Sequence, residues 1–166
     1  MPNKVLIIDG YNVIHKIPET RICLESSMML ARERLAYLAS KWKAVHTGFD
    51  CIIVFDGRNL GTGRINPRIG GIKCIFSASL HGADEEIVRL VKKSSRPSDI
   101  TVISDDNYVY NNCRAHGAQV RPSDYLLDTE CGQSLAKPNK SPDGKGLDSR
   151  TAEKISSEMR KKWKSK

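Results

Sequence analysis

The sequence lacks long apolar runs and paired cysteine motifs, and these absences argue against several classes of protein. No stretch approaches the roughly 20 apolar residues that a membrane-spanning helix needs, and no apolar signal region precedes the first expected strand. The 5 cysteines are scattered and lie outside any CxxC or Cys/His cluster, which argues against a disulfide framework and a zinc site. We therefore expect a cytoplasmic protein without a membrane partner, with reduced and mostly buried thiols.

Acidic residues are the minority charge: 27 Lys and Arg face 19 Asp and Glu, which gives a net charge of +8 and a pI near 9.3. A basic protein gains affinity for phosphate polymers by releasing their counterions, so RNA is a plausible partner. Part of the excess lies in residues 154–166 (KISSEMRKKWKSK), where a solvated basic tail explains it equally well.

Short apolar runs alternate with amphipathic segments, which predicts an α/β fold with a mainly parallel central sheet. In the longest expected helix, Arg32 is assigned to the polar face. With 166 residues we expect one compact domain over 1–131, followed by a polar basic tail over 132–166 in which a helix is left open. The expected strands are 5–8, 51–55, 72–76, 100–103 and 118–120. The expected helices are 24–46, 83–93, a short one ended by Gly117, and one opened by Pro122 with Ser123 as its N-cap.

Aspartates stand where three of these strands end: Asp9 after VLII, Asp56 after CIIVF and Asp105 after TVIS. Because the carboxyl ends of parallel strands meet at one edge of a sheet, we expect these side chains to converge, with Asp84 joining them from the start of a helix. Carboxylates held this close repel one another unless a cation lies among them, and Mg²⁺ or Mn²⁺ suits an all-oxygen site.

Each of these acids also has a structural interpretation, because an aspartate after a strand is often a turn former or a helix cap. Asn12 either caps the following element or orients a carboxylate or a metal-bound water through its amide. Of the adjacent pair after the fourth strand, Asp106 is the expected helix cap and Asp105 the expected ligand.

The strings IIDGYNVIH, VFDG, ADEEI and VISD resemble, in order and spacing, the successive motifs of the NYN domain in its YacP-like branch, within the PIN-like nuclease superfamily. The resemblance covers about residues 4–127. It implies a PIN-like three-layer sandwich and a metal-dependent endoribonuclease that acts on single-stranded or ribosome-associated RNA. It implies a catalytic set of Asp9, Asn12, Asp84 and Asp105, with Asp56 as a further metal ligand or a supporting acid.

The chain departs from the family pattern in two places. His81-Gly82 stand where many members have Glu-Thr before Ala-Asp, and Ile103 replaces a threonine before Ser-Asp. The lost hydroxyl beside Asp84 affects the fine positioning of the metal but removes no carboxylate.

RNA contacts are predicted around the acids. Arg58, Arg64 and Arg68 lie in a glycine-rich segment after the Asp56 strand and suit phosphates, although a solvated loop with incidental arginines is an equal alternative. Tyr11 is a candidate for base stacking and His81 for a substrate contact. For Tyr108 and Tyr110 we expect core packing, with at least one ring facing inward.

Two rival functions remain at this point, and the sequence leaves the oligomeric state open. An RNA-binding module with the same fold but without turnover would keep the basic surroundings, whereas the retained acids favour an enzyme. An aspartyl phosphatase or phosphoacceptor domain also carries strand-end aspartates, but the first strand lacks the Asp-x-Asp spacing. A dinucleotide-binding fold is disfavoured because no GxGxxG follows that strand.

Overall fold

The protein contains a six-stranded sheet with the strand order β3-β4-β2-β1-β5-β6. The coordinates are a computed structural model that describes residues 4–57, 67–77 and 82–128. All neighbouring strands pair in parallel except the antiparallel pair of β3 and β4. The strands are β1 (Lys4–Asp9), β2 (Phe49–Asp56), β3 (Arg68–Ile69), β4 (Ile72–Ser77), β5 (Ile100–Ile103) and β6 (Gln119–Arg121).

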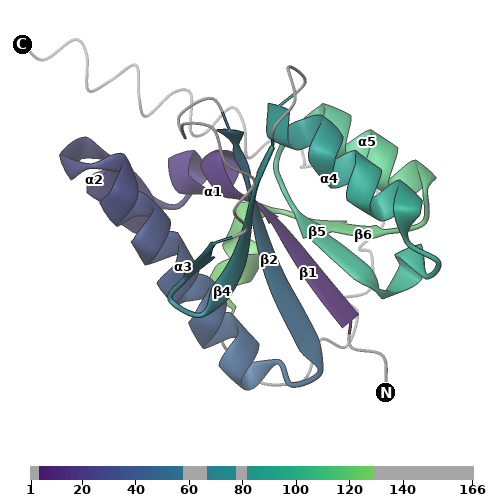
Figure 1. Ribbon diagram of the computed structural model, residues 1–166, viewed down its shortest axis with the longest axis horizontal. Coiled ribbons are helices and arrows are strands. Elements are labelled where there is room, and N and C mark those ends of the chain that lie inside the picture. The colour runs from purple at the N-terminus through teal and green to yellow at the C-terminus, as the bar shows by residue number, and fades with distance from the viewer. Residues whose placement is uncertain (1–3, 58–66, 78–81, 129–166) are drawn as a thin grey trace, which may run out of the picture. The chain divides into compact units, whose positions relative to one another are not determined.

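Helices cover both faces of this sheet, which gives the three layers of a PIN-like α/β sandwich and confirms the predicted fold class. Figure 1 shows α1, α2 and α3 on one side of the strands and α4 and α5 on the other. The helices are α1 (Gly10–Lys16), α2 (Pro18–Ser26), α3 (Met28–Val45), α4 (Gly82–Lys93) and α5 (Asn107–Ala115), with the 3-10 helices η2 (Pro97–Asp99) and η3 (Ser123–Leu127). Among the described segments, no helix combines the length and the apolarity that crossing a bilayer demands.

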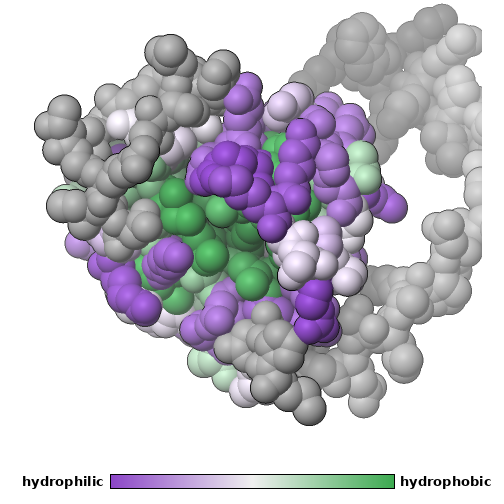
Figure 2. Space-filling model, turned by 45° about the vertical axis from the view of Figure 1, so that its right-hand side comes forward, coloured by the Kyte–Doolittle hydropathy of each residue, from purple (hydrophilic) through white to green (hydrophobic). Residues whose placement is uncertain are grey.

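The two faces of the sheet bury different kinds of side chain. Successive residues of a strand point to opposite faces, so Leu6 and Ile8 pack with α1 and α3 while Ile7 packs with α4 and α5. The first core contains the buried aromatic residues Trp42 and Phe55, whereas the second is aliphatic apart from a thiol. Figure 2 brings the side of α4 and α5 forward and shows a hydrophobic area bordered by hydrophilic side chains.

The helix predicted over residues 24–46 is two helices, and the segment before it is helical as well. Ser27 separates α2 from α3, because its Oγ accepts a hydrogen bond from the Leu30 backbone N–H at 3.0 Å and caps the second helix. The sequence pattern does not predict α1, since Gly10-Tyr11-Asn12 has the composition of a turn. Arg32 is also placed wrongly by the sequence pattern, because its side chain is buried and only 7% of the residue is exposed.

Two further expectations are wrong. Tyr108 and Tyr110 are 50% and 40% exposed, because the helix turns Val109 between them into the core. Ser123 does not cap a helix: it is the first residue of η3, after Pro122 at the N-cap, and its hydroxyl donates to Asp105 instead. The end of α5 is as predicted, with Gly117 in the left-handed region at φ 90°.

Both Asp-Gly pairs that end a strand need glycine for reasons of space. A Cβ on Gly57 would lie 1.8 Å from the backbone oxygen of Ser77, and a Cβ on Gly10 would lie 2.3 Å from the Phe55 ring. Neither glycine has a positive φ. The glycine therefore lets the chain turn tightly against its neighbours directly after the aspartate.

The thiols agree with the expectation where the structure describes them: Cys51, Cys74 and Cys113 are buried and free, and Cys23 is free and half-buried. The predicted domain boundary at residue 131 and the tail over 132–166 lie outside the described residues.

Candidate functional site

Asp9 is the last residue of β1, and its carboxylate is buried at the carboxyl edge of the sheet with 3% of the residue exposed. It occupies the N-cap position of α1, yet its side chain makes no capping hydrogen bond. The hydroxyl of Ser104, which follows β5, donates to Asp9 Oδ2 at 2.9 Å. Asp9 is thus not used as a helix cap, and this weakens the purely structural interpretation of the residue.

The environment of Asp9 disfavours its charge. Burial, together with the negative charges of Asp84 and Asp106, raises the pKa of Asp9 to about 6. The Ser104 hydroxyl and the nearby backbone amide of Asn12 act in the opposite direction. A buried carboxylate with an elevated pKa and acidic neighbours is typical of functional sites, where a cation or a substrate group completes the charge balance.

Asp84 reaches the same edge from the first turn of α4. The residue is exposed overall, but partial desolvation of its carboxyl group raises the pKa of Asp84, and the charges of Asp106 and Asp56 add to the effect. Asp56 ends β2, and its Oδ2 lies 3.6 Å from the position that a Cβ of Gly82 would occupy, beside the first residue of α4. Asp9, Asp84, Asp56 and Asp106, hereafter the acid cluster, therefore share one edge of the sheet.

Asp105 and Asp106 follow β5 and face different partners. Asp106 caps α5 as predicted, because its Oδ1 accepts from the backbone N–H groups of Tyr108 and Val109. Asp105 is exposed, and its Oδ2 accepts hydrogen bonds from the hydroxyl and the backbone N–H of Ser123. Of these two adjacent residues, Asp106 is the one whose charge raises the pKa of Asp9 and of Asp84. The role of Asp105 as a metal ligand stays a prediction.

Asn12 joins the ends of two neighbouring strands. Its side-chain Oδ1 accepts a hydrogen bond from the backbone N–H of Asp105 at 3.0 Å. The amide thus fixes the backbone after β5, while the backbone amide of the same residue lies near the carboxylate of Asp9. This contact goes to a backbone N–H, so orientation of a carboxylate or a metal-bound water by the Asn12 amide stays a prediction.

The donor chemistry of the acid cluster fits a hard divalent cation, since the side chains offer oxygen only and repel one another. In the part of the chain that the structure describes, no three Asp, Glu, His or Cys side chains are already grouped closely enough to hold an ion. The acid cluster therefore suits Mg²⁺ or Mn²⁺ by the type of its donor atoms.

Of the predicted RNA contacts, the structure describes Arg68 and Tyr11. Arg68 lies on β3, and its side chain donates a hydrogen bond to the Gly71 backbone oxygen. In the sheet, Arg68 lies opposite Lys73 of β4. Lys73 precedes by four residues Ser77, which lies opposite Asp56. At the rise of an extended strand, these four residues span about 13 Å. Arg68 therefore does not lie beside the acids, contrary to the expectation. Arg58, Arg64 and His81 lie outside the described residues.

Tyr11 is half-buried, and its ring packs against Phe55 with the ring centroids 5.2 Å apart. Its hydroxyl accepts a hydrogen bond from Nη2 of Arg32, a contact between residues 21 apart in the chain. The guanidinium lies 5.4 to 5.5 Å from the ring centroids of Tyr11, Phe55 and Phe76. This buried arginine was missed because a charged residue in an amphipathic pattern predicts solvent exposure.

A family model described as the YacP-like NYN domain matches residues 6–166. The chain belongs to this family. Its fold is similar to crystal structures of Rae1 (YacP) from Bacillus subtilis. A tryptophan-to-leucine mutant is 25% identical, with a TM-score of 0.60, over 74% of this chain and 71% of that chain. A second structure is 20% identical, with a TM-score of 0.55, over 95% of this chain and 78% of that chain.

No curated protein gives a significant match to the chain. Membership of the YacP-like NYN family supports a nuclease-type, RNA-related function, in agreement with the motifs IIDGYN, VFDG, ADEEI and VISD. The acid cluster contains the aspartates of the first three motifs, and the fourth motif ends at Asp105 beside it.

Proposed function

We propose that this YacP-like NYN protein is a cytoplasmic, divalent-metal-dependent endoribonuclease that hydrolyses RNA phosphodiester bonds at the carboxyl edge of its sheet. The proposal rests chiefly on Asp9, a carboxylate that is buried, not used as a cap, and raised in pKa to about 6 beside other acids. The net charge of +8 supports a polyanionic substrate around this negative centre.

Asp9, Asp56, Asp84 and Asp105 would hold the ion, with Asp9 and Asp84 as the central pair. When bound, Mg²⁺ or Mn²⁺ supplies positive charge that polarises a phosphodiester and lowers the pKa of a water molecule. The chain itself positions the acids: the Ser104 hydroxyl fixes Asp9 through Oδ2, and Asn12 fixes the backbone of Asp105. These contacts reduce the reorganisation needed when substrate arrives.

Single-stranded RNA is the proposed substrate, either free or associated with the ribosome. The exposed rings of Tyr108 and Tyr110 follow Asp106 on α5 and offer faces on which unpaired bases can stack. Tyr11 is a weaker candidate than the sequence indicated, because its ring is half-buried against Phe55.

The test is cleavage of labelled single-stranded RNA by the purified full chain with Mg²⁺ or Mn²⁺ and with a chelator, repeated on ribosome-bound mRNA. We expect Asp9→Asn and Asp84→Asn each to reduce the rate by about 100-fold or more while the far-ultraviolet circular dichroism is unchanged. Asp50→Asn is the matched control, because Asp50 is exposed at the opposite end of β2 in an ion pair with Lys43. Full activity in both site variants would refute the assignment.

A second candidate is an RNA-binding protein with this fold and no turnover. It is favoured by one observation, that the described residues contain no ready-made group of three metal-binding side chains. Binding of RNA without cleavage under every metal condition, including on ribosomes, would identify this alternative.

A further inference from the structure

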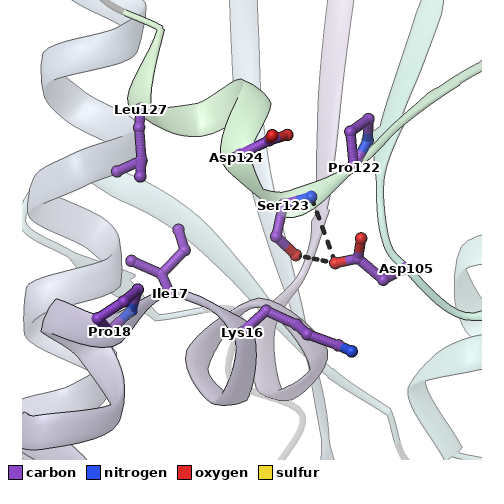
Figure 3. A pocket seen from close by; sticks show the side chains of 8 residues that line it. All are labelled: Lys16, Ile17, Pro18, Asp105, Pro122, Ser123, Asp124 and Leu127. Atoms are coloured by element: carbon purple, nitrogen blue, oxygen red, sulfur yellow. Dashed lines mark hydrogen bonds between the residues drawn. The ribbon is translucent and has the colours of Figure 1, made fainter. Parts of the chain in front are cut away.

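A pocket of about 260 Å³ opens at the carboxyl edge of the sheet, between the junction of α1 with α2 and the start of η3. Figure 3 shows Ile17 and Pro18 on one side of it and Pro122, Ser123 and Asp124 on the other. The pocket is slightly smaller than the roughly 300 Å³ at which sites for whole drug-sized ligands begin, so its size suits one group of a larger ligand.

The lining of this pocket combines an apolar wall with polar groups at its border. Two apolar side chains line the pocket: Ile17 is buried, and Leu127 is 42% exposed and so accessible to a ligand. Lys16 adds a cation, whereas Asp105 and Asp124 add carboxylates. Two carboxylates would repel a phosphate from the interior, and the apolar wall favours a flat, uncharged group such as a nucleobase.

Ser123 holds the carboxylate of Asp105 at the border of the pocket. It donates to Oδ2 from both its hydroxyl and its backbone N–H. Because Asp105 also belongs to the proposed metal ligands, the apolar wall is the surface that suits a base. Lys16 is exposed at the end of α1, where its amine can meet a phosphate outside the pocket.

The pocket is coupled to the acid cluster through the chain. Asp105 lines the pocket, Asp106 next to it acts on Asp9 and Asp84, and Asn12 ties Asp105 to the start of α1. An RNA strand whose phosphate lies at the acid cluster would place a neighbouring nucleotide along this edge.

We propose that the pocket receives the base of one unpaired RNA nucleotide that flanks the cleaved bond, with Lys16 contacting a phosphate of the same strand. The inference rests on the proposed function in taking RNA as the substrate. It adds a specific subsite and predicts that substrate must be single-stranded there, because a paired base cannot leave its stack to enter a pocket without an added energetic cost.

The experiment measures binding of a fluorescent single-stranded RNA of about 12 nucleotides by anisotropy, across a salt series, in the Asp84→Asn background so that turnover does not interfere. Leu127→Ala is expected to weaken binding about three- to tenfold without changing the salt dependence, because it removes apolar contact. Lys16→Ala is expected to lower the slope of log K against log salt by about 0.7, the value for one single-strand phosphate contact.

Two controls make the result specific. Lys93→Ala removes the same charge from an exposed site at the far end of α4 and should leave both affinity and slope unchanged. The same RNA annealed to its complement should bind Leu127→Ala as well as it binds the parent protein. Thermal unfolding of each variant verifies that the fold is intact, and Lys16 is exposed, so its substitution leaves the core untouched.

The outcomes separate this inference from the proposed function. If the wild-type chain cleaves RNA but Lys16→Ala and Leu127→Ala bind it as Lys93→Ala does, the subsite is wrong and the nuclease stands. If no cleavage occurs but both pocket variants weaken binding, the subsite stands in an RNA-binding protein. Absence of RNA binding by the wild-type chain would overturn both.

Discussion

Asp9 ends β1, and Asp105 follows β5, the neighbouring parallel strand. Asp9 is buried, is held by one side-chain hydrogen bond from Ser104, and has a pKa raised to about 6. Asp105 is exposed, and its Oδ2 accepts two hydrogen bonds from Ser123, one from the hydroxyl and one from the backbone N–H. The same sequence pattern, an apolar strand followed by aspartate, therefore has two outcomes. The ionised form of Asp9 is disfavoured, whereas the carboxylate of Asp105 is exposed and hydrogen-bonded.

The turns after the two aspartates are also anchored differently. After Asp105, the neighbouring Asp106 caps α5 through local hydrogen bonds. After Asp9, no side-chain cap forms, and the first turn of α1 is held by the distant Arg32 through the Tyr11 hydroxyl. The Asp9 turn thus depends on tertiary contacts, which leaves its carboxylate available for chemistry.

The largest expected effect concerns the pH dependence of stability. Because the folded-state pKa of Asp9 is about 6 against an ordinary 3.8, the folded protein holds this proton more tightly than the unfolded chain between these values. The contribution of Asp9 to the free energy of unfolding therefore falls as pH rises from about 4 to 6, by about 3 kcal/mol in total.

Urea unfolding at several pH values without divalent ions measures this contribution as the difference between the wild type and Asp9→Asn. The variant should be more stable at pH 7, and Asp105→Asn should retain the wild-type fall. Parallel pH curves for wild type and Asp9→Asn would contradict the environment described for this residue.

The next effect tests the anchor of the Asp9 turn. Tyr11→Phe removes the acceptor of the buried Arg32 guanidinium, whose Nε already has no hydrogen-bond partner among the described residues. We expect the free energy of unfolding to fall by about 2 kcal/mol, the range for a buried donor left unsatisfied. Tyr37→Phe, on the exposed side of α3, is the matched control and should change stability little. In an Arg32→Met background the Tyr11→Phe effect should disappear, and its persistence there would show that the hydroxyl acts through another partner.

A smaller effect is expected at the Asp105 turn. Ser123→Ala removes the hydroxyl that donates to Asp105 Oδ2 but keeps the backbone N–H on the same oxygen. Chemical unfolding should therefore register a loss of about 1 kcal/mol. Ser98→Ala, at an exposed position in η2, serves as the control, and equal effects of the two substitutions would argue against this contact.

The smallest effect links Ser104 to activity. Ser104→Ala removes the hydroxyl that favours the ionised form of Asp9, so the pKa of Asp9 should rise further. The acid limb of the cleavage rate against pH should move upward by less than about one pH unit. If the acid limb of the rate profile lies at the same pH in Ser104→Ala as in the wild type, the ionisation of Asp9 does not determine that limb.

The sequence was sufficient for the fold class and for five of the six strands, because these strands are short apolar runs with sharp ends, as in VLIID and CIIVFD. It predicted neither β3 nor α1. The capping role of Asp106 and the stop at Gly117 were also readable, since both depend on neighbours within a few residues. The sequence did not predict three features, because each depends on partners far away in the chain. These are the burial of Arg32, the exposure of Tyr108 and the hydrogen bond from Ser123 to Asp105.

The amino-acid sequence by itself determined that parallel strands end in acids, because strand propensity and the turn after each Asp-Gly pair are local properties. Only the tertiary structure decided which acid is buried. The pKa of Asp9 depends on desolvation by the surrounding fold and on charges from α4 and from the residue after Asp105, and these groups meet only when the sheet is assembled.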